Sequence, residues 1–101
     1  MYILKICDFG QAREMKDAQV ERPNYTEYVS TRWYRAPELL VESKNYDKSV
    51  DIWALGCIIP ELISGKPLFP GTTNFETLAY VLKTFGNNLT QGQIDTFYNN
   101  K

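Results

Sequence analysis

The sequence contains no histidine, and this absence removes several kinds of chemistry. Nucleophilic triads with an imidazole base and most zinc sites need histidine. Any chemistry in this chain must therefore run through carboxylates, hydroxyls or cations. Cysteine is also scarce: the two residues, Cys7 and Cys57, stand far apart in apolar stretches. Their setting is typical of small buried apolar side chains in a reducing compartment, rather than of a disulfide.

The sequence also lacks a charge bias and a long apolar run. The formal net charge at pH 7 is −1, so bulk electrostatics give no reason to expect nucleic acid or a membrane surface as a partner. No apolar run reaches the length of a membrane span, and no basic stretch precedes one as in an export signal. These features predict a soluble intracellular protein, located in the cytoplasm or the nucleus.

Apolar residues are present in sufficient number to build a core. Of 101 residues, 44% are hydrophobic and 14% are aromatic, which argues against disorder along the whole chain and fits one domain or part of one. The stretch from Tyr2 to Cys7 is expected to form a short strand. The polar segment from Gln11 to Tyr25 has no clean period and is expected to be a loop.

Helical patterns dominate the remainder of the sequence. Helices are expected over Glu38–Val41 behind Pro37, and over Ser49–Ser64, Asn74–Phe85 and Thr90–Thr96. The helix from Ser49 is apolar on nearly all sides, which is typical of a buried helix, and Ser49 and Gly65 are its expected caps. Pro60 predicts a kink or an early end, at a cost of about 3 kcal/mol. Asn74 and Gly86 are the expected caps of the next helix.

Three short motifs occur in order along the chain. They are Asp8-Phe9-Gly10, Ala36-Pro37-Glu38, and the stretch DIWALG from Asp51 to Gly56. Either tripeptide alone is a weak signal. In this order, and separated by the length of an activation loop, they are typical of protein kinases, whose signatures include D-F-G and A-P-E. The chain therefore resembles the protein kinase family.

Longer stretches narrow this resemblance. The run TEYVSTRWYRAPELL, residues 26–40, is similar to the CMGC group, which contains the mitogen-activated and cyclin-dependent kinases. The stretches PLFPG (67–71) and FGNNLTQGQIDTFYNNK (85–101) look most like the cyclin-dependent kinase-like branch, followed by the male germ cell-associated kinase branch. The resemblance implies an α+β fold class, in which residues 1–101 are a fragment of the mainly helical C-terminal lobe of a kinase domain.

The resemblance also implies an ATP and Mg²⁺ site near the start of the chain. Asp8 corresponds to the metal-binding aspartate, since Mg²⁺ prefers hard oxygen ligands. Phe9 would pack inward and set the direction of Asp8, while Cys7 would line the floor of the ATP site. Considered without its neighbouring motifs, Asp8 would be expected only to cap a turn.

An activation segment is implied by the pair Thr26-x-Tyr28. In the kinases that this chain resembles, both residues are phosphorylated, and a phosphate carries about −2 charge that pairs well with arginine. By position, phosphate on Thr26 would be bound by Arg13, and phosphate on Tyr28 by Arg32 and Arg35. In the unmodified chain, the two later arginines are expected to be solvated or paired with neighbouring glutamates.

Four further residues match positions with known roles in the family. Thr31 matches the threonine that contacts the catalytic aspartate and lysine, and Trp33 helps to shape the substrate pocket. Glu38 matches a glutamate that pairs with an arginine late in the lobe. Asp51 matches an aspartate that accepts hydrogen bonds from the catalytic-loop backbone. The resemblance gives both of the last two carboxylates structural roles.

Several parts of a complete kinase are absent from these residues. They contain no glycine-rich loop, no ATP-site lysine and no catalytic-loop aspartate, so the chain alone is expected to be inactive and to be a truncated piece of a serine/threonine kinase. Its partners would be ATP, protein substrates and an upstream activating kinase. A kinase remnant that acts as an interaction module is the alternative, and an unrelated helical binding protein would require the three motifs to be accidental. Exposed apolar surface and association are expected.

Overall fold

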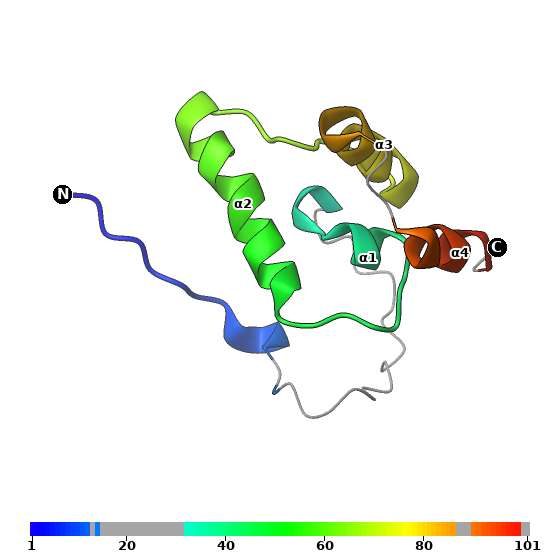
Figure 1. Cartoon of the computed structure of the whole chain (residues 1–101). Coiled ribbons are helices and arrows are strands. Elements are labelled where there is room, and N and C mark those ends of the chain that lie inside the picture. Colours follow the sequence, from blue (N-terminus) through cyan, green and yellow to red (C-terminus); the bar gives the residue numbers. More distant parts are fainter. Residues whose placement is uncertain (13, 15–31, 87–89, 100–101) are drawn as a thin grey trace.

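The computed structural model describes residues 1–12, 14, 32–86 and 90–99. Within these residues, two short 3-10 helices, η1 (Phe9–Gln11) and η2 (Arg32–Tyr34), precede four α-helices, which are α1 (Pro37–Leu40), α2 (Ser49–Ser64), α3 (Asn74–Phe85) and α4 (Gln91–Asn99). Figure 1 shows α2, α1 and α3 grouped together, with the N-terminal segment leading away from them. The expected helices all form, and α4 ends later than the pattern predicted.

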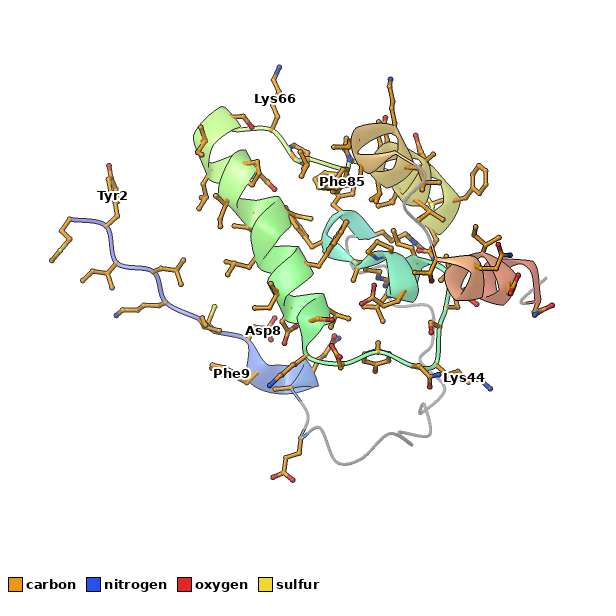
Figure 2. The ribbon with its side chains drawn as sticks, in the orientation of Figure 1. Tyr2, Asp8, Phe9, Lys44, Lys66 and Phe85 are labelled. Carbon is orange, nitrogen blue, oxygen red and sulfur yellow. The ribbon has the colours of Figure 1, made fainter. Side chains whose placement is uncertain are left out.

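The N-terminal segment, residues 1–7, differs from the prediction because it forms no strand. A strand needs a neighbour to bond its N–H and C=O groups, and no other described segment forms a strand with it. Its apolar side chains are consequently exposed, including Ile3 at 73% and Ile6 at 77% (Figure 2). Cys7 is also exposed, so the predicted burial of this thiol is wrong, whereas Cys57 is buried as expected.

Helix α2 does not begin with the expected Ser49 cap, and it ends through the backbone geometry of a glycine. The cap position is Lys48, and Oδ1 of Asp47 accepts a 2.7 Å hydrogen bond from the N–H of Ser49. Gly65 ends the helix as predicted, with φ 70° and its N–H bonded to the carbonyl of Glu61. Pro60 lies inside α2 without ending it, so the predicted early end is wrong. A proline at this position leaves the carbonyl of Gly56 without its usual helical N–H donor.

Helix α3 begins with a capping box. Thr73, and not Asn74, is the cap: its Oγ1 accepts from the N–H of Glu76 over 3.1 Å. The carboxylate of Glu76 reaches back to Thr72, accepting from its N–H at 2.8 Å and from its hydroxyl at 2.6 Å. These bonds satisfy donors that a helix start leaves without partners. Gly86 closes the helix as predicted, with φ 77°.

The core consists of two small clusters that share helix α3. One cluster joins the end of α1 to α3 through Leu40, Val41, Leu78 and Leu82. The other joins α2 to α3 and η2 through Cys57, Phe69, Val81, Tyr34 and Trp53. Trp53, Phe69 and Phe85 also form an aromatic group with ring centroids 5.8–6.2 Å apart. Because α3 contributes to both clusters, it fixes η2 and α1 relative to α2.

One side of α2 remains outside both clusters. Its apolar side chains are exposed at Ile52 (69%), Leu62 (74%) and Ile63 (84%), so the predicted burial of this helix on nearly all sides is wrong. The apolar pattern is present, but the described residues cover only the side that carries Trp53 and Cys57. The exposed apolar surface that the sequence predicted is therefore found along α2. Among the described helices, none is both long enough and apolar enough to cross a membrane.

Candidate functional site

Asp8 lies at the end of the N-terminal segment, immediately before η1. Its backbone is left-handed, with φ 64° and ψ 62°, a conformation that aspartate tolerates better than most residues. Its side chain makes no capping hydrogen bond to η1, so the alternative in which Asp8 only caps a turn gains no support. Asp8 is exposed (Figure 2), and a Cβ added at Gly10 would lie 3.8 Å from its Oδ1. The group is thus accessible to a cation.

Phe9 does not pack inward. It is 68% exposed, and neither core cluster includes its ring. The predicted inward packing of Phe9 is therefore wrong, while its control over the direction of Asp8 stays a prediction. The physical reason is that the described helices bury their apolar side chains against one another, and η1 makes no substantial contact with them.

A second group of polar residues lies where η2 meets the start of α3. Nε of Arg32 donates to Oδ1 of Asn74 over 3.1 Å, and Nη1 of Arg35 donates to the same oxygen over 3.5 Å. Both arginines are half-buried. Burial lowers the pKa of Arg35, and the positive charge of Arg32 lowers it further. The two guanidinium groups are therefore close enough to repel each other.

Asn74 was missed by the sequence reasoning, which treated it only as a helix cap. It lies 42 residues from Arg32 and 39 from Arg35, and no local pattern relates such distant positions. Arg32 and Arg35 share one acceptor in the structure, and their predicted binding of phosphate stays a prediction. The sequence predicted these two arginines to be solvated or paired with glutamates. In the structure both instead donate to the uncharged amide of Asn74.

Trp33 anchors η2 to the turn before α3. Its Nε1 donates to the carbonyl of Gly71 over 3.1 Å. Gly71 is packed closely against α3, because a Cβ at this position would lie 2.7 Å from Cα of Thr77. Thr77 is fully buried, and its hydroxyl donates to the carbonyl of Thr73 over 2.9 Å. Glycine at this position therefore lets the turn approach α3 and present its carbonyl to Trp33.

Tyr34 joins η2 to α2. Its hydroxyl donates to Oε2 of Glu61 over 2.8 Å. This bond, followed by burial, raises the pKa of Tyr34 above its ordinary value of 10.0. Together, Arg32, Trp33 and Tyr34 hold η2 to α3, the turn before α3, and α2. The segment that leads into the A-P-E motif is thereby fixed on three sides.

The two carboxylates predicted to be structural lie in the first turns of different helices. Glu38 is half-buried in α1, and Asp51 is exposed in α2. An acidic group in the first turn interacts favourably with the positive end of the helix dipole. Their predicted partners belong to other parts of a kinase domain, so the two assignments stay predictions.

Several predicted site residues lie outside the described part of the chain. They are Arg13, Thr26, Tyr28 and Thr31. For the residues that are described, no group of three or more cysteine and acidic side chains is arranged to hold a metal ion. Asp8 would therefore supply one ligand, and the remaining ligands of a Mg²⁺ ion would have to be phosphate oxygens, water or other protein groups.

Comparison with known proteins bears on these assignments. A family model described as the protein kinase domain matches residues 1–99. Cyclin-dependent kinase-like 2 of Oryctolagus cuniculus is 45% identical over 98 residues, which is 97% of this chain and 17% of the relative. Cyclin-dependent kinase-like 5 of Homo sapiens is 49% identical over 97% of this chain and 10% of the relative. Mitogen-activated protein kinase mpk-1 of Caenorhabditis elegans is 51% identical over 83% of this chain and 19% of the relative.

The matched relatives are much longer than this chain, which spans less than a fifth of their length. The helical arrangement of the described residues confirms the prediction of a fragment of the mainly helical C-terminal lobe. The similarity to cyclin-dependent kinase-like and mitogen-activated kinases confirms the resemblance to the CMGC group. The chain belongs to the protein kinase family, as a segment of a kinase domain related to these enzymes.

Proposed function

We propose that this chain is the segment of an ATP-dependent serine/threonine protein kinase that contains the D-F-G motif, the activation segment, the A-P-E motif and helices α2 and α3. The observation that carries the proposal is the fixed position of the A-P-E motif. Ala36 is 1% exposed, and α1 packs on α3 through Leu40 and Val41. A protein substrate bound beside η2 would therefore meet a rigid surface, while Asp8 stays exposed and free to turn toward a metal.

In the complete domain, Asp8 holds Mg²⁺ and Cys7 lines the ATP site. Mg²⁺ held there would supply positive charge that offsets the negative charge of the phosphates, and the carboxylate of Asp8 would keep the ion in place. Thr31 contacts the catalytic groups, Glu38 pairs with an arginine late in the lobe, and Asp51 accepts hydrogen bonds from the catalytic-loop backbone. The 101 residues include no general base of the H-R-D type, so the chain alone carries out no transfer.

Activation in this proposal depends on phosphorylation of Thr26 and Tyr28 by an upstream kinase. Arg13 receives the phosphate on Thr26, and Arg32 and Arg35 receive the phosphate on Tyr28. Support comes from the placement of the last two side chains, which meet at one oxygen. A phosphate between two arginines forms charge-assisted hydrogen bonds, which are stronger than neutral ones.

The test uses the full-length protein that contains this chain. Replacement Asp8→Asn removes a negative ligand from the metal, so transfer of labelled phosphate from ATP to a protein substrate should fall by roughly a hundredfold or more. The matched control is Asp95→Asn, because Asp95 is an exposed aspartate on α4 whose Oδ1 accepts a hydrogen bond from Nε2 of Gln91, one turn away. Equal transfer by the Asp8→Asn variant and the unmodified protein would refute the proposal.

A second candidate function is a non-catalytic interaction module derived from a kinase. The exposed apolar side of α2 favours it, since such a surface is typical of protein contact sites. The coding sequence upstream of Met1 distinguishes the two candidates. A continuous reading frame that encodes a glycine-rich loop and an H-R-D loop supports the enzyme, and a frame without them supports the module.

A further inference from the structure

The carbonyl group of Gly71 is held in place from two sides. On one side, the N–H of Gly71 donates to the carbonyl of Phe69 over 2.9 Å, and Phe69 is 1% exposed within the core. On the other side, a Cβ added at Gly71 would lie 2.7 Å from Cα of Thr77, a backbone atom of α3. A backbone atom cannot rotate out of the way as a side chain can, so glycine is required at this position. The core therefore fixes the direction of the Gly71 carbonyl.

Trp33 depends on this carbonyl for the orientation of its ring. Its Nε1 donates to the oxygen of Gly71 over 3.1 Å, across 38 positions of the chain. An indole ring has one donor and no acceptor, so this is the one hydrogen bond that can orient it. The side chain is half-buried, which leaves part of it at the surface of η2. The contact therefore fixes a side chain that a bound peptide can reach.

The neighbours of Trp33 in η2 are held independently of Gly71. Arg32 donates to the start of α3 over 3.1 Å, and Tyr34 donates to α2 over 2.8 Å. Loss of the Gly71 contact should therefore release the ring of Trp33 while η2 stays attached to both helices. The expected consequence is a change in the shape of the surface beside η2, rather than loss of the whole segment.

We infer that Gly71 is a positioning residue that sets the affinity for a peptide substrate by orienting the ring of Trp33. The inference rests on the proposed function in one respect, which is that a protein substrate binds beside η2. The recognition is apolar contact between the accessible part of the indole ring and the peptide. Because Gly71 is itself buried, its effect on the peptide passes through Trp33.

The first test follows Trp33 directly in the 101-residue chain. The chain has two tryptophans, so its nitrogen-15 spectrum contains two indole N–H signals, and the signal that Trp33→Phe removes belongs to Trp33. We expect Gly71→Ala to speed the exchange of this proton with water by about fivefold, because its acceptor moves away. The signal of Trp53, which stacks on Phe69, shows whether the core stays folded. Gly92→Ala is the matched control, since a Cβ added at Gly92 meets no described atom within 4 Å.

The second test measures catalysis by the full-length protein that contains this chain. Its substrates are peptides with one serine each, which differ only in the residue after the serine, and the best of them is used for the kinetics. We expect Gly71→Ala to raise KM for the peptide by about tenfold and to leave KM for ATP unchanged. Trp33→Phe keeps an aromatic ring but lacks the donor, so it should raise KM for the peptide by a similar factor. Gly92→Ala should change neither constant.

A double-mutant cycle separates positioning from a general loss of structure. If Gly71 acts through Trp33, then Gly71→Ala should raise KM for the peptide by less than about twofold once Trp33→Phe is present. Multiplication of the two single effects would overturn the inference. An unchanged KM for the peptide in either single variant would also overturn it, even if the exchange of the indole proton becomes faster.

The proposed function and this inference fail in different ways. A full-length protein that transfers no phosphate would refute the proposed function, and the substrate role of Gly71 with it. Normal transfer together with an unchanged KM for the peptide in Gly71→Ala would overturn this inference alone. The exchange of the indole proton does not involve catalysis, so it reports on the contact between Gly71 and Trp33 in either case.

Discussion

Tyr34 shows how a single side chain couples η2 to the longest described helix. Its hydroxyl donates to the carboxylate of Glu61, and this contact raises the pKa of Tyr34 above 10.0. Because the folded-state pKa is raised, the stability from this contact is fully present below pH 10. It is lost as the pH rises through the raised value, where the phenolate and the carboxylate repel each other.

We predict that Glu61→Gln lowers the pKa of Tyr34 toward 10.0, since an uncharged acceptor favours the phenol less strongly. Carbon-13 NMR of the labelled tyrosine ring carbons measures the titration, and the signal is assigned by its absence in Tyr34→Phe. The Tyr34→Phe variant lacks the hydroxyl that donates to Glu61, so its free energy of unfolding should be lower by about 1 kcal/mol. A pKa of Tyr34 that stays the same in Glu61→Gln would show that burial, and not the bond, causes the shift.

The residues proposed to bind Mg²⁺ and ATP are not the ones that hold η2 in place. Asp8 and Cys7 are exposed on a segment without regular structure before η1, whereas Arg32, Trp33 and Tyr34 are each fixed by a hydrogen bond to a distant element. Cys57 belongs with the residues that hold the chain, because burial raises the pKa of its thiol and keeps it protonated. Sequence motifs predicted the roles proposed for Asp8 and Cys7. Only the distances between atoms in the structure identified the hydrogen bonds that hold η2 in place.

At the scale of elements, α3 is the helix that both core clusters share. It contributes Leu78 to one core cluster and Val81 to the other, and its first turn carries Asn74. Its start depends on the capping box made by Thr73 and Glu76. A weakened cap should therefore loosen η2 and α1 as well as α3.

We predict that Thr73→Ala lowers the free energy of unfolding by about 1 kcal/mol, because the N–H of Glu76 loses its acceptor. Chemical denaturation followed by far-ultraviolet circular dichroism measures the change. Thr73→Ser keeps the hydroxyl and should retain most of the stability. Thr84→Ala is the matched control within α3, since the exposed Thr84 hydroxyl bonds only to the carbonyl of Tyr80. Equal losses in Thr73→Ala and Thr73→Ser would contradict the role of the cap.

At the scale of the whole molecule, the described residues bury few large apolar side chains and expose many. The described core has two clusters, while α2 and the first residues expose large apolar side chains. Exposed apolar patches of this kind promote association in water. The described arrangement is consistent with a segment whose remaining contacts belong to a larger domain, as the lengths of its relatives indicate.

We predict that the purified chain associates as its concentration rises, and that Leu62→Glu reduces this association. Leu62 is 74% exposed, so a charge there disrupts the apolar surface of α2 without entering either core cluster. Sedimentation velocity over a range of concentrations measures the effect, and circular dichroism confirms that helix content is retained. Lys66→Gln, on an exposed residue just beyond α2, changes the net charge by the same −1 and controls for it. A chain that remains monomeric at every concentration would disprove this prediction.

The sequence determined the elements that depend on local chemistry. Gly65 and Gly86 end their helices because glycine accepts a positive φ at little cost, and Pro37 starts α1 because its missing N–H is not needed there. The ordered D-F-G and A-P-E motifs are sufficient to identify the family, since their order and spacing along the chain are themselves the signal.

Tertiary structure decided what depends on distant partners. The segment before Asp8 has a strand-like pattern but forms no strand, because a strand requires a hydrogen-bonded neighbour. Helix α2 has an apolar pattern on most sides, but one side stays exposed because packing on α3 and η2 covers only part of it. The contact of Arg32 and Arg35 with Asn74 likewise joins residues about forty positions apart, a distance that local pattern cannot span.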